Sequence, residues 1–566
     1  MRDLIQLLAF VLRLSGQIRD LRRSFVLIVV AGVASGLAAT GMIALINSII
    51  SAGEGTPVRL VIGFAVLCVV LPVARFVSQW VLINMSQSAL LELRMRYSRR
   101  VLEAPLRQIE MIGPARLLAT LTSDIATIAE TLNIVPVLIM HFTVVVSCFV
   151  YLGWLNWRVL AQLVLVVGLA IASYQLALQK AFLNFTRSRH RLDEVLGQIR
   201  SMVEGIKELK MHRERRLAFV GSIKESTVAL LSENRSGQIL LAATSSWGQV
   251  MFFLVVGLVV LVMPRFQPLE TKVLSGYTII LFQLMVPLEV LLNAFPNLSR
   301  ASVAVRKVEE LGFILESEAT PMVPVLAVSH WQSIELEGVS HTYRRDNDES
   351  FLLGPINLRF REGELVFIVG GNGSGKTTFA KLLVGLYSPE AGNISVDGEI
   401  VTEESRERYR ERFSVVFSDF FVFDKLLGLT EAKSFATEAQ RYIELLQLDR
   451  KVQIEGGHIS TVEISQGQRK RLALLAAYLE DRPLYLFDEW AADQDPVFKN
   501  IFYTELLPNL QRRGKTIFVI SHDDRYFHIA DRVIKLDYGK VESDLTRPEW
   551  ALAEFVQNET LRVSKI

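Results

Sequence analysis

Hydrophobic residues are concentrated in the first 300 positions of the chain, which has 566 residues. A helix crosses a bilayer with about 20 consecutive apolar residues. Six stretches are long enough to do so, and we expect the spans at these positions: 24–50, 58–86, 133–154, 158–178, 240–263 and 274–296. Buried core helices are the alternative, but such helices rarely exceed about 20 apolar residues or follow one another six times. The pattern therefore predicts an all-α membrane domain.

Two long connections, at 87–132 and 179–239, separate some of these stretches. Both keep helix-like spacing of apolar residues with few breakers, so we expect them to extend the membrane helices. A Gly-Pro pair at 113–114 interrupts the first connection, and 114–120 can restart as a short helix across the loop's tip, touching another domain. The segment 203–210 has a similar mixed character. A solvated charged face without a docking role is the alternative for both segments.

Beyond about residue 300 the pattern changes. The segment 301–330 loses hydrophobicity and contains Pro321 and Pro324, which is typical of a linker. From there on, short apolar runs, turns and helical stretches alternate, which predicts an α/β domain of ordinary size. The expected organisation is a membrane domain at 1–300, a linker at 301–330 and an α/β domain at 331–566.

Composition and charge agree with a membrane protein and exclude some partners. Hydrophobic residues make up 51% of the chain, and its mean hydropathy of +0.32 is high for a soluble protein. The net charge is +2, so nucleic acid is not indicated as a partner. The two cysteines, Cys68 and Cys148, both fall inside expected spans, so we expect neither a disulfide framework nor a metal cluster.

The positions of lysine and arginine predict the orientation of the chain in the membrane. The short connections at 51–57 and 155–157 carry neither residue, whereas both long connections are basic. Because basic loops stay on the cytoplasmic side, we expect both long connections, the N-terminus and the C-terminal half in the cytoplasm. Membrane lipid is therefore an expected partner.

A glycine-rich loop follows the apolar strand predicted at 365–369 and precedes a predicted helix. It fits the pattern G-x-x-x-x-G-K-[ST], in which glycines let backbone amides converge on phosphate oxygens. Lys376 would neutralise the outer phosphates, and the Thr377 hydroxyl would ligate Mg²⁺. An ordinary glycine turn is the alternative. The expected nucleotide-binding residues of this loop are Gly370, Asn372, Gly373, Ser374, Gly375, Lys376, Thr377 and Thr378.

Two further buried strands end in residues suited to phosphate chemistry. The strand at 484–488 ends in Asp488, which would hold Mg²⁺ through its water shell, and Glu489 follows it. Glu489 would accept a proton from the attacking water or orient it. The strand at 516–520 leads to His522, which could bond to the γ-phosphate and that water. Either feature alone is more often structural, but three such strand ends in this order predict a site that hydrolyses a nucleoside triphosphate.

These residues, together with the run Ile464-Ser465-Gln466-Gly467-Gln468-Arg469-Lys470-Arg471, resemble the ATP-binding cassette (ABC) family over nearly the whole chain. The last run resembles the family's signature motif at the start of a helix. The resemblance implies ATP as the nucleotide, held by the phosphate loop of one subunit and covered by the signature of another. The residues that it implies at this second surface are Ser465, Gln466, Gly467 and Gln468, with Ser465 and Gly467 on the γ-phosphate.

The same resemblance assigns two further residues. Tyr343 matches the aromatic residue that stacks on adenine, with simple packing as the alternative. Asp495 matches the loop that communicates between the two ATP sites. Two positions depart from the family pattern, because Gln466 replaces a glycine of the signature and Ser418 replaces an expected glutamine. We expect Ser418 or Asp419, through water, to link the γ-phosphate and Mg²⁺ to the membrane loops.

Six spans followed by one cassette resemble an exporter-type half-transporter, which implies a homodimer. The runs 418–424, 467–474 and 487–496 resemble the cyclic-peptide and siderophore exporters of the syringomycin and pyoverdine type. The resemblance implies ATP-driven export of a peptide-like substrate by alternating access across the bacterial inner membrane, and it leaves periplasmic accessory proteins open. A lipid or multidrug exporter is one alternative. An ATP-gated regulator or channel that does not pump is another.

Three ionisable residues, Arg75, His141 and Glu289, lie within the apolar stretches. Facing lipid would cost several kcal/mol for each. We therefore expect them to face a cavity or one another, as substrate contacts or as helix-pairing groups. Pro287 is expected to kink the last span and Pro296 to mark its end.

Overall fold

A computed structural model describes residues 19–52, 57–266, 270–316, 331–344, 350–429 and 434–547. The chain forms two compact units, which we call the membrane unit and the ATPase unit after the roles expected from the sequence. The described residues up to Tyr97, together with Leu117–Leu311, form the membrane unit, and Ser98–Arg116 belongs with the described residues after Gly312. Residues 301–311 thus pack with the membrane helices although we expected them in a linker, and residues 317–330 of that linker lie outside the described residues.

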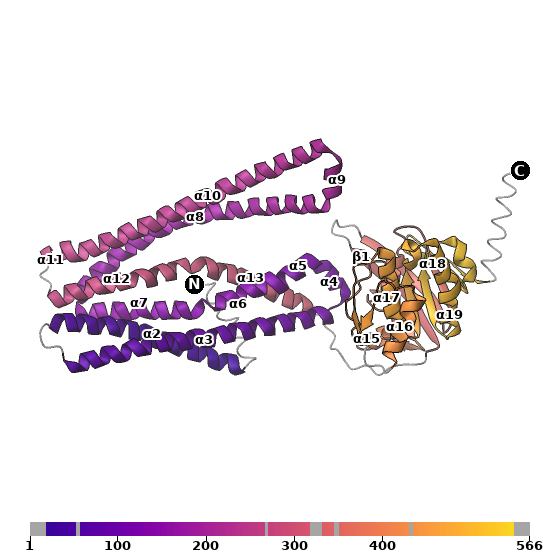
Figure 1. Ribbon diagram of the computed structural model, residues 1–566, viewed down its shortest axis with the longest axis horizontal. Coiled ribbons are helices and arrows are strands. Elements are labelled where there is room, and N and C mark those ends of the chain that lie inside the picture. The colour runs from indigo at the N-terminus through magenta and orange to yellow at the C-terminus, as the bar shows by residue number, and fades with distance from the viewer. Residues whose placement is uncertain are drawn as a thin grey trace. The chain divides into compact units, whose positions relative to one another are not determined.

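The membrane unit is all-helical in its described part. Six of its helical stretches are long and apolar enough to cross a membrane, and each overlaps one of the six predicted spans. Figure 1 shows α8 and α10 running side by side, joined at one end by α9. The helices are α2 (Arg19–Ala52), α3 (Val58–Glu103), α5 (Pro114–Ala119), the π-helical turn η1 (Thr120–Asp124), α6 (Ile125–Leu132), α7 (Val135–Leu155), α8 (Trp157–Glu204), α9 (Ile206–Met211), α10 (Arg213–Gly257), the π-helical turn η2 (Leu258–Val262), α11 (Met263–Phe266), α12 (Thr271–Asn293) and α13 (Phe295–Glu316).

Small side chains allow close helix packing in this unit, as is usual between membrane helices. A Cβ atom on Gly36 of α2 would lie only 2.7 Å from Cβ of Thr143 on α7, so glycine permits the contact. Tyr277 of α12 is buried, and its hydroxyl donates to the carbonyl oxygens of Leu152 at 3.0 Å and Asn156 at 2.7 Å. These contacts join α2, α7 and α12 into one core.

The helix breaks occur close to the predicted positions. In the second long connection Gly205 separates α8 from α9. The last span, α12, ends at Asn293, shortly before Pro296. In the first connection α4 (Leu106–Ile112) ends at Gly113, whose φ of +79° favours glycine, and α5 follows. The predicted helix after the break exists as α5. Helix α4, before the break, belongs with the ATPase unit, and so does the start of α5 up to Arg116.

The ATPase unit contains two large β-sheets. One has the order β2-β1-β4-β5 and is antiparallel, and the other has the order β12-β11-β3-β10-β9-β6 and is parallel except at β12. The strands are β1 (Ser333–Arg344), β2 (Ser350–Arg361), β3 (Leu365–Val369), β4 (Ala391–Val396), β5 (Glu399–Ile400), β6 (Phe413–Val416), β7 (Ile454–Glu455), β8 (His458–Ile459), β9 (Leu484–Asp488), β10 (Thr516–Ile520), β11 (Arg532–Asp537) and β12 (Lys540–Thr546).

Helices cover the parallel sheet. They are α14 (Lys376–Leu383), α15 (Arg406–Arg410), α16 (Phe435–Leu445), α17 (Gln466–Glu480), the 3-10 turn η3 (Trp490–Asp493), α18 (Pro496–Ile501), the π-helical turn η4 (Phe502–Leu506), α19 (Leu507–Arg512) and the 3-10 turn η5 (Asp524–Ile529).

Strands β3, β9 and β10 lie at the centre of the parallel sheet and are buried on both faces. Alternate residues face two separate cores: Phe367 and Phe487 lie in one, whereas Val366 and Leu486 lie in the other. This burial explains the unbroken apolar runs in the sequence. Because the strands are parallel, their carboxyl ends meet at one edge of the sheet, and the three predicted strand-end motifs lie there together.

Candidate nucleotide site

The phosphate loop needs glycine at several positions. Gly370, Gly373 and Gly375 all have φ between +79° and +150°, a region that favours glycine. A Cβ atom on Gly370 would also lie 2.2 Å from the carbonyl oxygen of Leu536. The loop leads directly into the N-terminus of α14, where free backbone N–H groups attract anions.

Lys376 and Ser374 present donors within this loop. The ammonium group of Lys376 donates to the carbonyl oxygens of Gly370 and Gly371, both at 3.0 Å. Burial lowers the pKa of Lys376, and the carboxylates of Glu489 and Asp488 oppose that shift. The buried hydroxyl of Ser374 has no hydrogen-bond partner among the described residues. Together these donors suit phosphate oxygens.

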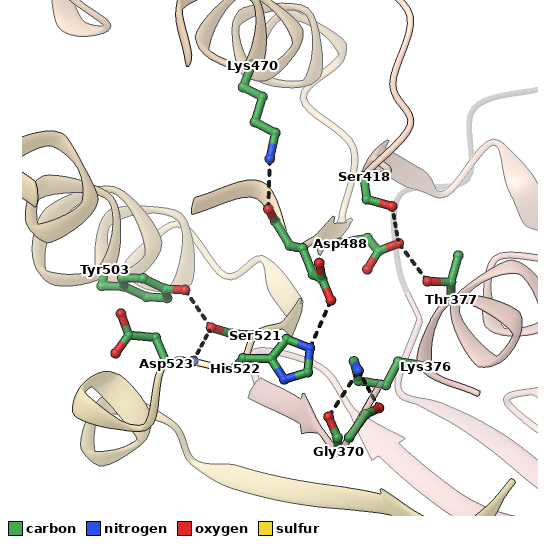
Figure 2. Close-up of polar contacts among 12 residues, drawn as sticks. Gly370, Lys376, Thr377, Ser418, Lys470, Asp488, Tyr503, Ser521, His522 and Asp523 are labelled. Carbon is green, nitrogen blue, oxygen red and sulfur yellow. Dashed lines mark hydrogen bonds and ion pairs between the residues drawn. The ribbon is translucent and has the colours of Figure 1, made fainter. Parts of the chain in front are cut away.

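Asp488 lies at the centre of a cluster of oxygen atoms at the end of β9. Its Oδ2 accepts from the hydroxyls of Thr377 and Ser418, both at 3.2 Å, and Figure 2 shows both side chains directed at it. Its other carboxylate oxygen, Oδ1, is buried and has no hydrogen-bond partner in the described part of the chain. Burial and the neighbouring Glu489 raise the pKa of Asp488, whereas the two hydroxyls oppose that rise.

This cluster fits a hard divalent cation. Its donors are all oxygens, which Mg²⁺ prefers, and the unpaired carboxylate oxygen of Asp488 is free to accept a metal-bound water. Of the two residues that we expected near this position, Ser418 lies in the cluster. Asp419 is exposed in the following turn, and no bond from it to the cluster is found among the described residues.

Glu489 and His522 lie next to each other at the ends of adjacent parallel strands. The Nε2 atom of His522 is 3.0 Å from Oε1 of Glu489. Glu489 has a left-handed backbone with φ of 49°, which turns its side chain into the cleft described next. A carboxylate held by an imidazole in a phosphate-loop cleft is suited to positioning water.

The cleft beside the phosphate loop has a volume of about 730 Å³. Tyr343, which is 39% exposed, lines it, and so does Phe351, its cross-strand neighbour in the pairing of β1 with β2. An exposed aromatic ring beside a phosphate site can stack on a base. We did not predict Phe351, because its position beside Tyr343 depends on strand register.

The signature residues lie at the start of α17. Ser465 caps this helix: its hydroxyl accepts from the amide of Gln468 at 3.3 Å, and its own amide donates to the Gln468 side chain at 3.2 Å. None of Ser465, Gln466, Gly467, Gln468 and Asp495 is among the described residues that line the cleft. Within one chain, therefore, the signature and the phosphate loop do not face the same cleft.

A buried lysine connects the signature helix to the end of β9. Lys470 is 3% exposed, and its ammonium lies 2.8 Å from Oδ2 of Asp493 and donates to the carbonyl oxygen of Glu489 at 3.0 Å. Gln466 donates to the same oxygen of Asp493 at 3.2 Å. Asp495 caps α18 and pairs with Arg471. We did not predict Lys470 and Asp493 as a pair, because helix and loop residues meet only through the sheet topology.

The loop that carries His522 is held by its neighbours. The hydroxyls of Tyr503 and Ser521 lie 2.8 Å apart, and Ser521 accepts from the amide of Asp523 at 3.1 Å (Figure 2). Asp523 forms ion pairs with Arg525 at 2.8 Å and Lys499 at 2.5 Å. The bonds from Arg525 and then Lys499 hold the pKa of Asp523 well below its usual range, although burial opposes the shift. The backbone around His522 is therefore anchored on both sides.

Helix α4 belongs to the ATPase unit and is anchored near α14. Glu110 pairs with Lys381 of α14 at 2.7 Å and accepts from the hydroxyl of Tyr387. Arg107 pairs with Glu390 at 2.8 Å. Burial and the bond to Glu110 raise the pKa of Tyr387, so its hydroxyl stays a donor. These contacts link the first long connection to the helix that starts at the phosphate loop.

Comparison with known proteins identifies the family. The family model "ABC transporter" matches residues 353–492, and the model "ABC transporter transmembrane region" matches residues 22–281. A protein named ATP-binding protein SyrD, from Pseudomonas syringae pv. syringae, is 40% identical over 81% of this chain and 83% of its own length. The chain therefore belongs to the ABC transporter family.

More distant relatives differ in their named cargo. An ATP-dependent lipid A-core flippase of Ralstonia nicotianae is 25% identical over 84% of this chain and 82% of its own length. A lactococcin transport/processing ATP-binding protein of Lactococcus lactis subsp. lactis is 24% identical over 85% of this chain and 68% of its own length. The structure of a bacterial Atm1-family ABC exporter with ATP bound shares the fold, with a TM-score of 0.73 and 17% identity over 96% of this chain and 99% of the other.

These findings confirm the predicted fold class and family. The protein is a multi-pass integral membrane half-transporter of the exporter type, with an ABC ATPase domain fused to six membrane-spanning helices. It binds ATP and uses ATP to drive export.

Proposed function

We propose that the protein works as a homodimer in the bacterial inner membrane and exports a peptide-like cargo, a cyclic peptide or a siderophore or its precursor. The observation that carries the proposal is the separation of the signature from the phosphate-loop cleft within one chain. A second copy, related by two-fold symmetry, would supply Ser465 and Gly467 to the cleft of the first. Two equivalent ATP sites then form, each shared between the two chains.

In this scheme each side chain of the site has one task. The phosphate loop and Lys376 bind and neutralise the phosphates, and Tyr343 stacks on adenine. Glu489 accepts the proton of the attacking water while His522 holds Glu489 and the γ-phosphate. Thr377, Ser418 and Asp488 would hold Mg²⁺, which when bound supplies positive charge against the charge that develops on the phosphate oxygens.

Coupling to the membrane would proceed through the helices at the tips of the long connections. Contacts to the signature form only when the two ATPase domains close, so ATP can bias the transporter toward its closed state by its differential affinity. Helix α4 is bonded to α14 by Glu110, and α14 begins at the phosphate loop. Closure would therefore move α4, and α9 at the second tip, and exchange inward for outward access.

The peptide-like cargo is supported by the motif resemblance within the cassette and by the relative that transports lactococcin. A lipid cargo is the second candidate, favoured by the relative named a lipid A-core flippase. Mass spectrometry of the medium from cells with and without the protein separates them. A peptide-like product missing from the medium of the deletion strain supports the proposal, and a change confined to membrane lipids contradicts it.

Turnover itself is tested with a Glu489→Gln variant. Purified in nanodiscs, it should lose ATPase activity by about a hundredfold or more while still binding ATP, because the base is removed and the phosphate loop is intact. Glu505→Gln, a change at an exposed residue of η4, is the matched control and should keep the wild-type rate. Wild-type ATPase activity in Glu489→Gln would overturn the role of Glu489. Cargo uptake into inverted vesicles without hydrolysis would favour an ATP-gated channel.

A further inference from the structure

A cavity of about 160 Å³ lies inside the membrane unit, between α7, α8, α10 and α12. It is separate from the nucleotide site, and most of its wall is aliphatic or aromatic. Four polar side chains are exceptions: Tyr174 of α8, Ser245 and Gln249 of α10, and Glu289 of α12.

The polar residues all lie at the same end of the cavity. Helix α8 enters the membrane at Trp157, so Tyr174 lies about three turns, roughly 16 Å, further toward the cytoplasmic side than Leu163. Helix α10 runs the opposite way, and Ser245 precedes Val255 by a similar length. On α12, Glu289 follows Leu281 by about two turns, roughly 12 Å. In the orientation predicted from the basic connections, the four polar side chains thus lie toward the cytoplasmic end, where Leu288 and Leu292 also line the cavity, and the other end is apolar.

Specific contacts build this cavity. Gly248 lets α10 approach α8 closely, since a Cβ atom there would lie 3.3 Å from the ring of Tyr174. Trp247 donates to the hydroxyl of Ser173 at 3.2 Å. Phe252 packs edge-on against Phe282, with ring centres 5.8 Å apart. The π-helical turn η2 directly follows α10, and such turns often occur near functional sites.

Glu289 has no cationic neighbour in the cavity. Lysine, arginine and histidine are absent from the described lining residues, and no ion pair to Glu289 occurs in the part of the chain that the structure describes. An ionisable side chain in a membrane span is unfavourable unless it meets a partner or water. A bound ligand with a positive charge would supply that partner.

We propose that this cavity binds amphiphiles that carry a primary ammonium group and an apolar chain. The ammonium group pairs with Glu289 and bonds to Gln249 and Tyr174, and the apolar chain extends toward Leu163, Val255 and Leu281. This proposal rests on the exporter function proposed above and narrows its cargo to peptide-like molecules with a free amine and an apolar tail. Glu289 is then the residue that determines specificity for charge.

Photolabelling of the full-length protein in nanodiscs, without ATP, tests the site directly. The probe is octylamine with a diazirine at its terminal carbon, a chain short enough for the cavity, and the matched probe is the corresponding alcohol. We expect saturable labelling by the amine on the peptides that contain Leu163, Val255 and Leu281, because the chain end lies there. Labelling spread evenly over the lipid-facing helices, or concentrated at Tyr174 and Ser245, overturns the proposal.

Variants separate the charge from the shape of the cavity. Glu289→Gln keeps the size of the side chain and removes its charge. The amine concentration that gives half-maximal labelling should therefore rise by roughly tenfold, while labelling by the alcohol is unchanged. Glu270→Gln makes the same change just before α12, outside the cavity, and should behave as wild type. Leu284→Phe fills the apolar part and should weaken labelling by both probes.

These outcomes are independent of the proposed transport cycle. An unchanged amine affinity in Glu289→Gln overturns the binding site, even if export of a peptide-like cargo requires ATP. Amine binding that depends on Glu289 supports the site, even if the exported molecule proves to be a lipid. The gel-filtration profile and the Tm of each variant, measured without probe, should match those of the wild-type protein, which confirms that the variants are folded.

Discussion

The ammonium group of Lys470 lies almost wholly inside the ATPase domain, where an unpaired charge would be unfavourable. It is stabilised by Asp493 and by the carbonyl oxygen of Glu489. Gln466, the residue that departs from the usual signature, donates to the same carboxylate. A continuous set of polar contacts thus joins the signature, which would face the partner's ATP, to the backbone of the predicted general base.

We expect Lys470→Met to lower kcat for ATP hydrolysis by about tenfold with little change in the KM for ATP. Methionine fills the space but leaves the carbonyl group of Glu489 without its donor, and Lys470 does not line the cleft. Steady-state kinetics of the purified protein check this split. Arg469→Met, an exposed neighbour with the same loss of charge, should match wild type. A raised KM with unchanged kcat would contradict the positioning role.

Asp523 predicts a dependence of stability on pH. Its pKa is lower in the folded protein than in the unfolded chain, because of its bonds to Arg525 and Lys499. Its contribution to stability is therefore complete above the unfolded pKa, near 3.9, and is lost as the pH falls through the folded-state pKa. Asp523→Asn should lower Tm by a few degrees at pH 7, and this difference should shrink below about pH 4.

Thermal unfolding of the detergent-solubilised protein at several pH values measures that difference in Tm. Asp524→Asn, the adjacent exposed position, is the matched control and should have the wild-type Tm throughout. A Tm difference for Asp523→Asn that grows as the pH falls would show that the ion pairs are not its source.

Sequence motifs predicted which residues form the site better than they predicted the hydrogen bonds and ion pairs between those residues. The phosphate loop, Asp488, Glu489 and His522 lie at or just after the end of a recognisable strand, so their shared edge could be predicted from parallel pairing. The bonds between Ser418 and Asp488, or Lys470 and Asp493, join segments far apart in the chain. Neither periodicity nor spacing encodes such contacts, because they depend on strand order.

At the scale of elements, helix α4 of the first long connection is bonded to α14 of the ATPase unit. We expected the docking helix at 114–120, after the Gly-Pro break, because proline favours a helix start. The structure adds docking contacts on the preceding helix, through Arg107 and Glu110. Apolar periodicity is similar on both sides of the break, so it could not predict the charged pairs of α4.

We expect Glu110→Ala to uncouple ATP hydrolysis from transport. The change removes the ion pair with Lys381 and the bond from Tyr387. Both partners line the cleft, but Glu110 itself does not, and the phosphate loop and Glu489 are unchanged. ATPase activity should stay within about threefold of wild type, while ATP-driven export of the cargo falls by about tenfold or more. Transport and hydrolysis are measured on the same vesicles. Glu92→Ala, at an exposed position of α3, controls for loss of charge, and a parallel fall of both activities in Glu110→Ala would contradict uncoupling.

At the scale of the whole molecule, hydropathy predicted all six spans, because the bilayer requires long apolar helices. It could not predict which helices surround the cavity at Glu289, since lipid-facing and cavity-facing residues are equally apolar. The boundary of the membrane unit was also misplaced. Residues 301–311 are polar enough to suggest a linker, yet Ala301, Val305 and Val308 are buried in α13 against that unit.

The proposed dimer predicts that two different defective chains can together form one intact ATP site. Lys376→Ala disables the phosphate loop and Ser465→Arg disables the signature, so a homodimer of either variant has no complete ATP site. If each site is shared between chains, a mixed dimer of the two variants has one doubly damaged site and one intact site. With Glu489→Gln in both chains to block hydrolysis, the mixed dimer should retain about one ATP through gel filtration, whereas each parental homodimer should retain almost none. A mixed dimer as empty as its parents would place both halves of the site in one chain, and shared ATP would no longer explain how the two chains close together.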